Sequence, residues 1–326
     1  MTEHEAAEAF RRIVRGDACE LEIAEVLVTL RARGETAEEI AGAAMALREA
    51  AVPVPIGDLA VADTCGTGGD GGGTLNISTA AALVAAEAGV PVAKHGNRSI
   101  SSRCGSADVI EACGVRIDQS PGEAADTLRE VGICFLYAPL YHAGTRHAAP
   151  VRRRLGGRTI FNVIGPLSNP ARPRWQVVGV YDPGLCEPVA ATLARLGCEG
   201  ALVVHGGGLD EIALHADTQA VLLLDGRTTR LTLAPEACGI ARAPLSALAG
   251  GTAAENAAWL GDLAGGGGTE AQRAAVAMNA GALLWVSGRA ADWPCGVASA
   301  LDVLRSGRAA ARLRRWVERS NDGAAR

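Results

Sequence analysis

From residue 59 onward, short apolar runs alternate with helix-like segments, and this alternation constrains the fold more than any other feature. LAVADTC, VPVAKHGN, GICFLYAP, WQVVGVYDP and GALVVHG have the length and the β-branched content of buried strands. STAAALVAAEAG has Ser78 near its start and Gly89 past its end, as helices do. Strands separated by helices predict an α/β fold with a largely parallel sheet flanked by helices. AVLLLDGRTTRLTL adds an antiparallel hairpin on Asp225-Gly226.

The chain before residue 51 follows a different pattern. Residues 3–50 predict helices, with an apolar stripe at Ile23, Val26, Leu27 and Leu30. Thr36 and Glu39 have the spacing of a capping box. AVPVPIGD then breaks the helical pattern and predicts a linker, whereas the last seventy residues are again mostly helical.

Charge and cysteine usage exclude several classes of protein. The net charge of −5 and the pI of about 5.8 argue against a nucleic-acid partner. No apolar run is long enough to cross a bilayer, and the polar start MTEHEAAEAF does not resemble a signal peptide, so we expect no membrane partner. Nine cysteines without a C-x-x-C pair predict reduced thiols and a cytoplasmic location.

The stretch DTCGTGGDGGGTLNIST, residues 63–79, predicts a phosphate-binding loop between a strand and a helix. It satisfies G-x-G-x-x-G, but a dinucleotide fold needs an acidic residue after the second strand, where this chain has Lys94-His95. A Walker loop is excluded because its lysine is absent. A tight turn without a ligand would not explain the hydroxyl and amide side chains that follow.

A phosphorylated sugar satisfies the whole stretch. Glycine amides and the side chains at the start of the helix would bind phosphate; these are Thr74, Asn76, Ser78 and Thr79. Asp70 would accept hydrogen bonds from sugar hydroxyls or hold a magnesium-bound water. The carboxylate inside a phosphate loop is then no contradiction.

Three further stretches carry polar chemistry. KHGNRSISSRCGSAD, residues 94–108, combines cations with four serines and suits an anion, although it could equally be a solvated loop. In VVHGGGLDE, Asp210 and Glu211 would serve one Mg²⁺ if they lie in a turn and two ions otherwise, although such a pair could also be a surface acidic pair. Residues 141–159 are basic and predict a helix, on which one arginine could bind a carboxylate. No nucleophile triad is present, so we predict no covalent catalysis.

Together these motifs resemble the anthranilate phosphoribosyltransferase family of tryptophan biosynthesis. The resemblance runs from about residue 20 to the C-terminus, in family order. The matching stretches are GTGGD, NIST, KHGNR, GSADVIEACG, RTIFNVIGPLSNPA, VVHGGGLDE, ENAAWL and NAGALL.

The resemblance implies a small helical domain at residues 1–58, to which residues 138–157 contribute helices, and an α/β phosphoribosyltransferase domain at residues 59–326. It also implies the fold of pyrimidine nucleoside phosphorylases and a site at the hinge between the domains. The implied reaction joins phosphoribosyl pyrophosphate (PRPP) and anthranilate, with Mg²⁺, and releases pyrophosphate.

The resemblance also implies roles for individual residues. PRPP would be bound by Gly66, Gly69, Asp70, Thr74, Asn76, Ser78, Thr79, Lys94, Ser102 and Ser106. Anthranilate would be bound by Gly66, Asn97, His142 and Arg152, with Arg152 on its carboxylate. Magnesium would be held by Ser78, Asp210 and Glu211, and His95 and Arg152 would position the substrates.

The chain departs from the family pattern at two places. The family usually has His-Pro where this chain has His142-Ala143, which leaves a different aromatic acceptor as an alternative. The first helix is expected to be missing or shortened, although the resemblance still implies a homodimer formed through the helical domain. A nucleoside phosphorylase is a second alternative, and a non-enzymatic nucleic-acid-binding relative is a third. The intact GTGGD and the acidic charge argue against the last.

Overall fold

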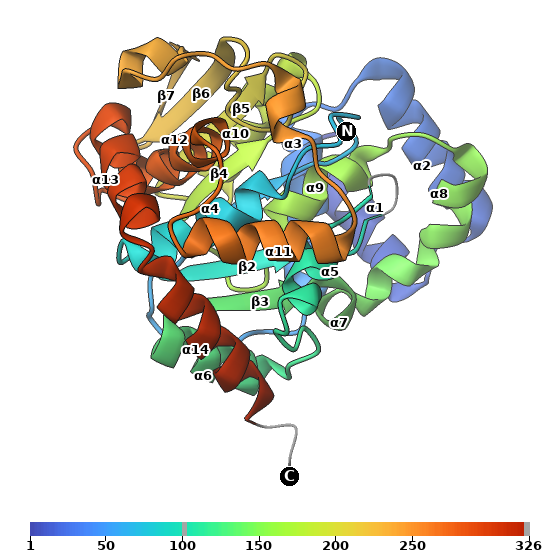
Figure 1. Ribbon diagram of the computed structural model, residues 1–326. Coiled ribbons are helices and arrows are strands. Elements are labelled where there is room, and N and C mark those ends of the chain that lie inside the picture. The colour runs from blue at the N-terminus through green and yellow to red at the C-terminus, as the bar shows by residue number, and fades with distance from the viewer. Residues whose placement is uncertain (100–102, 323–326) are drawn as a thin grey trace.

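The computed structural model describes residues 1–99 and 103–322 (Figure 1). Its centre is one sheet of seven strands in the order β3-β2-β1-β4-β5-β6-β7. The strands are β1 (Ala62–Gly66), β2 (Val92–Gly96), β3 (Ile133–Tyr137), β4 (Trp175–Gly179), β5 (Gly200–Gly206), β6 (Thr218–Leu224) and β7 (Arg227–Leu233). The first five are parallel, and β6 and β7 are antiparallel. The predicted mostly parallel sheet is confirmed.

The β6–β7 hairpin turns where the sequence predicted it. Leu224 pairs with Arg227, so Asp225 and Gly226 form a two-residue loop. Both have positive φ, 50° and 72°, as a type I′ turn requires. Asp tolerates this conformation better than most side chains, which explains why the dipeptide was a usable signal.

Helices cover both faces of the sheet. One face packs on α4 (Ile77–Glu87) and α12 (Glu270–Val286), and the other on α9 (Ile160–Leu167) and α10 (Cys186–Arg195). The remaining helices are α5 (Ser106–Ala112), α6 (Pro121–Val131), α7 (Ala138–Tyr141), α8 (Ala149–Leu155), α11 (Ala253–Ala264), α13 (Trp293–Ser306) and α14 (Ala309–Asn321). Four short 3₁₀ helices are η1 (Ala143–His147), η2 (Pro183–Leu185), η3 (Pro235–Cys238) and η4 (Leu245–Leu248). Among the described residues, no helix is both long enough and apolar enough to cross a bilayer.

The start of the chain is helical, as predicted, and its helices are α1 (Glu3–Arg15), α2 (Glu20–Arg33) and α3 (Ala37–Ala50). The capping box of α3 is present, because the Thr36 hydroxyl accepts the Glu39 N–H and the Glu39 carboxylate accepts the Thr36 N–H. Residues 143–155 pack beside these helices, η1 against α1 and α8 against α2. The basic stretch 141–159 is therefore helical only in part, since it consists of two short helices and a loop at Gly156-Gly157.

Helix α3 is bonded to the α/β layer near both of its ends. Near its C-terminal end, Arg48 donates to the carbonyls of Leu167 (2.7 Å) and Leu196 (3.2 Å), where α9 and α10 end. Burial lowers the pKa of Arg48 to about 10, so the guanidinium stays charged at neutral pH and faces two negative helix ends. At the other end, the Thr192 hydroxyl donates to the Ala37 carbonyl (3.1 Å).

Helices α12 and α13 cross at a pair of glycines, and this crossing predicts a large loss of stability on substitution. A Cβ on Gly281 would lie 2.5 Å from the Val297 nitrogen, and one on Gly296 would overlap the Gly281 carbonyl. We expect Gly281→Ala to reduce the free energy of unfolding by more than about 3 kcal/mol, because two packed backbones would have to separate. Thermal and urea unfolding measure this.

Gly261 in α11 supplies the matched control. A Cβ there meets no atom within 4 Å, so Gly261→Ala should stabilise the protein by up to about 1 kcal/mol through helix propensity. Equal unfolding midpoints for Gly281→Ala and Gly261→Ala would contradict the predicted loss of stability at the crossing.

Candidate active site

The sheet has a topological switch point next to β1. From β1 the chain proceeds to β2 and β3 on one side, and it later fills the other side with β4 and β5. Ligands of open α/β sheets bind outside the carboxyl ends of the strands at such a point. A cavity of about 1200 Å³ lies there, lined by the glycine loop, the end of β2, Asp210-Glu211 and the segment from α8 to α9.

Two glycines allow the loop after β5 to lie across the sheet end. A Cβ on Gly66, at the end of β1, would overlap the Asp210 carboxylate. A Cβ on Gly179, at the end of β4, would overlap the Asp210 backbone. Any side chain at either position would push Asp210 away from the glycine loop. Gly66 is therefore needed because of its contact with Asp210, which lies more than 140 residues away in the sequence.

The glycine loop is held from two sides. The Gly68 N–H donates to Asp210 Oδ2 (2.6 Å). On the opposite side, Arg158 donates to the Gly69 carbonyl, and its guanidinium lies 4.1 Å from the ring centre of Tyr181. Arg158 and Tyr181 were not predicted as site residues, and no local pattern identifies them, because their contact with the loop is long-range.

The predicted metal ligands lie together in a bend after β5. Asp210 faces the glycine loop, and Glu211 Oε1 accepts the Ser78 N–H (3.1 Å) at the start of α4. Burial, and then the Asp70 charge, raise the pKa of Asp210 to about 7. Burial, and then the Asp210 charge, raise the pKa of Glu211 to about 8. Asp210 and Glu211 thus lie in a bend, the arrangement in which the sequence predicts that they serve one Mg²⁺.

The donor set fits magnesium. Mutually repelling carboxylates in an enclosed site are stabilised by a divalent cation, and Mg²⁺ prefers hard oxygen ligands. In residues 1–99 and 103–322, no three His, Cys, Asp or Glu side chains are arranged to hold a metal ion by themselves. Two carboxylates therefore need water or substrate phosphate oxygens to complete the shell, which is the usual magnesium arrangement.

The predicted phosphate-binding side chains surround the start of α4. Asn76 precedes the helix, donates to the Cys104 carbonyl (3.2 Å) and accepts from Asn256 (2.8 Å). The buried Thr79 hydroxyl has no hydrogen-bond partner in the described part of the chain. Thr74, Ser78 and Ser106 also line the cavity. Ser102 lies outside the described residues, so its predicted role is neither supported nor opposed.

Lys94 and His95 lie at the end of β2. The Lys94 side chain is 1% exposed and its Nζ donates to the Thr64 carbonyl (2.7 Å). Burial, and then the nearby His142, lower the pKa of His95 to about 3, so its imidazole is neutral at pH 7. Both residues line the cavity.

His142 is the one predicted site residue, among those described, that does not reach the cavity. Its ring packs edge-on against His95, with centroids 5.2 Å apart, and it is 7% exposed. Burial lowers its pKa to about 4. The turn between α7 and η1 buries it behind His95, so direct contact with a bound aromatic acid would require His95 to move.

Arg152 is a cation without a carboxylate partner in the described residues. It projects from α8 into the cavity wall, and its guanidinium lies 5.0 Å from the ring centre of Phe161. Burial lowers its pKa, which means that its charge is poorly solvated. Asn97 lines the same cavity from the end of β2. An aromatic carboxylate would satisfy both the charge and the ring.

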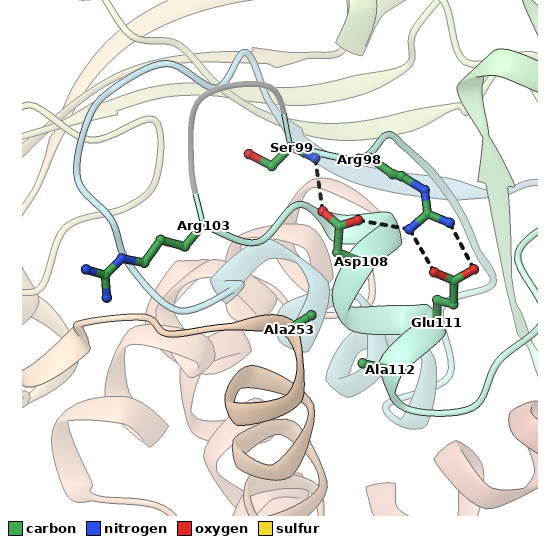
Figure 2. A pocket seen from close by; sticks show the side chains of 7 residues that line it. All are labelled: Arg98, Ser99, Arg103, Asp108, Glu111, Ala112 and Ala253. Carbon is green, nitrogen blue, oxygen red and sulfur yellow. Dashed lines mark hydrogen bonds and ion pairs between the residues drawn. The ribbon is translucent and has the colours of Figure 1, made fainter.

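Arg98 forms ion pairs with two carboxylates of α5. Its guanidinium bonds Asp108 (3.0 Å) and makes two bonds to Glu111 (2.7 and 2.9 Å), beside a second cavity of about 490 Å³ (Figure 2). Asp108 also accepts the N–H groups of Ser99 and Gly105. The interpretation of residues 94–108 as one anion-binding loop is thus too broad, because Arg98 holds α5 in place.

Comparisons with known proteins agree with this geometry. Residues 1–51 match the model "Glycosyl transferase family, helical bundle domain", and residues 58–310 match "Glycosyl transferase family, a/b domain". An anthranilate phosphoribosyltransferase of Sorangium cellulosum is 57% identical over 97% of this chain and 90% of its own length. A Thermus thermophilus anthranilate phosphoribosyltransferase superposes with a TM-score of 0.94 at 44% identity, covering 98% of this chain and 96% of that one.

A more distant structure was solved with ligands. The Saccharomyces cerevisiae anthranilate phosphoribosyltransferase in complex with PRPP and Mg superposes with a TM-score of 0.89 at 27% identity, over 98% of this chain and 93% of that one. High identity over almost the whole chain, together with a shared fold, identifies the group of proteins. The chain belongs to the anthranilate phosphoribosyltransferase family.

Proposed function

We propose that this protein transfers the phosphoribosyl group of PRPP to the amino group of anthranilate, giving N-(5-phosphoribosyl)anthranilate and pyrophosphate. This is the second step from chorismate to tryptophan. The observation that carries the proposal is one cavity that holds a glycine loop, a carboxylate pair and an arginine without a carboxylate partner among the described residues. These groups suit phosphate, magnesium and an organic acid in turn.

The donor would occupy the glycine loop and the start of α4. Backbone amides of Gly66 and Gly69, with the side chains of Thr74, Asn76, Ser78, Thr79, Lys94, Ser102 and Ser106, would bind PRPP. The unpartnered hydroxyl of Thr79 supports this assignment. Asp70 would accept hydrogen bonds from the sugar or from metal-bound water.

Magnesium would be held by Ser78, Asp210 and Glu211. When bound, Mg²⁺ supplies positive charge to the phosphate oxygens of the leaving pyrophosphate. The bend that directs Asp210 to the glycine loop and Glu211 to the start of α4 supports this assignment. The relative from Saccharomyces cerevisiae in complex with PRPP and Mg supports magnesium as the cation.

Anthranilate would lie between Asn97 and Arg152, next to Gly66. The Arg152 guanidinium would bind the carboxylate through two hydrogen bonds, in the planar geometry that arginine favours. His95 would position the aromatic ring as a neutral imidazole, with His142 supporting it from behind.

The chemistry requires alignment more than proton transfer. Displacement at the anomeric carbon develops positive charge on the ribose and negative charge on the pyrophosphate, so cations and amides at the leaving group lower the barrier. The aniline nitrogen of anthranilate is uncharged at neutral pH and needs no strong base. The low pKa of His95 agrees, because a group with a pKa of about 3 is a weak base.

Anthranilate fluorescence tests the proposal. We expect the signal to decay only when protein, PRPP and Mg²⁺ are all present. Omission of any one component should leave the fluorescence constant, and EDTA should stop the decay.

Two other results would redirect the assignment. Constant fluorescence with PRPP still bound in calorimetry would favour a different aromatic acceptor, since Ala143 and Gly144 replace the usual pattern. Phosphorolysis of thymidine or uridine, without binding of PRPP, would favour a nucleoside phosphorylase.

The same proposal includes the organisation of the chain. We propose a helical domain at residues 1–58, joined by the helices of 138–157, and an α/β domain at 59–326. Leu21 and Val28 lie seven residues apart on α2 and are 78% and 48% exposed, which supports a homodimer through the helical domain. Light scattering measures that state. Nine cysteines without a C-x-x-C pair support a cytoplasmic location.

A further inference from the structure

Strand β1 carries a fully buried carboxylate that the proposed chemistry does not use. Asp63 lies in the centre of the sheet and is 0% exposed. Central parallel strands are normally apolar on both faces, and a buried carboxylate is costly unless hydrogen bonds compensate it. The hydrogen bonds that Asp63 accepts should therefore explain why a carboxylate occupies this position.

The backbones of β1 and β2 separate just where Asp63 lies. The two strands pair at Ala62 and Val92 alone, whereas β1 pairs with β4 over five residues. Two side chains bridge the gap in place of the backbone. Asp63 Oδ1 accepts the His95 N–H (3.3 Å), and Lys94 Nζ donates to the Thr64 carbonyl (2.7 Å).

Asn169 fixes the orientation of Asp63 from outside the two strands. Its Nδ2 donates to Asp63 Oδ2 (2.8 Å) and to the Ala93 carbonyl (2.8 Å), and its Oδ1 accepts the Ala171 N–H (2.9 Å). Asn169 is also 0% exposed. Both N–H groups and the oxygen of the Asn169 amide thus form hydrogen bonds that join β1, β2 and the segment after α9.

The charge on Lys94 needs a compensating anion. Lys94 has no carboxylate within ion-pair distance among the described residues, and the two that act on it at longer range are Asp63 and Glu211. Magnesium bound to Glu211 would compensate the charge of that carboxylate. Of Asp63 and Glu211, Asp63 is then the one that compensates the charge of Lys94.

We propose that Asp63, oriented by Asn169, is a positioning residue of the donor site. It links β1 to β2 where their backbones no longer pair and balances the charge of Lys94, so that the ammonium is presented to the pyrophosphate of PRPP. This inference rests on the proposed function, because it requires PRPP as the donor.

The test compares Asp63→Asn, which keeps the shape and removes the charge, with Asn169→Ala, which keeps the charge and removes its support. Asp58→Asn is the matched control, because Asp58 is exposed and lies five residues away in the linker. PRPP binding with Mg²⁺ is measured by calorimetry, without acceptor, and KM is measured for both substrates. Because Lys94 is the only lysine in the chain, lysine-selective isotope labelling gives a single side-chain NMR signal.

We expect Asp63→Asn to weaken PRPP binding at least about tenfold, while the anthranilate KM changes by less than about twofold. The shift of the lysine signal on addition of PRPP and Mg²⁺ should be lost. Asn169→Ala should weaken PRPP binding in the same direction by about threefold or more, and Asp58→Asn should behave as wild type.

Two outcomes would overturn the inference. One is a folded Asp63→Asn protein with wild-type PRPP affinity. The other is an equal rise of both KM values with the lysine shift retained, which indicates structural support alone. If Asp63→Asn does not fold, wild-type PRPP affinity in Asn169→Ala overturns it. Wild-type protein that binds PRPP but does not consume anthranilate contradicts the proposed acceptor and leaves this test intact.

Discussion

The double substitution of Asp210 by Asn and Glu211 by Gln is expected to abolish magnesium-dependent turnover, with kcat/KM for PRPP falling at least about 10³-fold. The variant removes the carboxylate that bonds the glycine loop and the one that bonds the start of α4, while keeping the size of each side chain. Steady-state kinetics over a range of Mg²⁺ concentrations measure the loss. Full activity in the double variant would contradict the metal assignment.

Stability separates this effect from misfolding. Burial and the Asp70 charge raise the pKa of Asp210, and burial and the Asp210 charge raise the pKa of Glu211, so without metal the replacement of both carboxylates relieves repulsion. We expect the metal-free double variant to unfold at a temperature at or above that of the wild type. The matched control is Asp217→Asn with Glu236→Gln, which removes the same charge from exposed partners of Arg242. It should keep full activity.

Arg152→Ala is expected to raise the KM for anthranilate about 10- to 100-fold and to leave the KM for PRPP within about threefold. The guanidinium lies next to Phe161 and has no carboxylate partner in residues 1–99 and 103–322, and a charged hydrogen-bonded pair to the acceptor would be lost. Arg152→Lys should recover only part of the affinity, because an ammonium cannot form the planar two-bond contact.

Arg154 is the appropriate control for Arg152. It lies on the same helix, is exposed and pairs with Glu20. Arg154→Ala should leave both KM values unchanged. An unchanged anthranilate KM in Arg152→Ala would remove Arg152 from the site.

Local patterns were sufficient to predict the strands, the helical start of the chain and the Asp-Gly turn. Strand length, helix caps and the Asp-Gly turn are set by neighbours in sequence, and the structure has them at the expected places. The resemblance to a known family then brought residues from distant segments together, and most of those described line one cavity.

Long-range contacts could not be predicted in the same way. The tether of Gly69 by Arg158, the bridge from Asn169 to Asp63 and the burial of His142 behind His95 depend on how separate segments pack. One signal was present in the sequence. An aspartate within the apolar run LAVADTC indicates a buried charge, and a buried charge requires partners.

The bonds at the two ends of α3 have a mechanical consequence. Arg48 joins one end to the helix termini of α9 and α10, and Ala37 joins the other end to Thr192 of α10. Motion that carried α3 away from α9 and α10 would have to break all three bonds together. Helix α3 therefore acts as part of the stationary frame, although it is encoded with the helical segment. Helices α2 and α8 are outside these three bonds. They contact each other, and Arg31 donates to the Gly156 carbonyl at the end of α8.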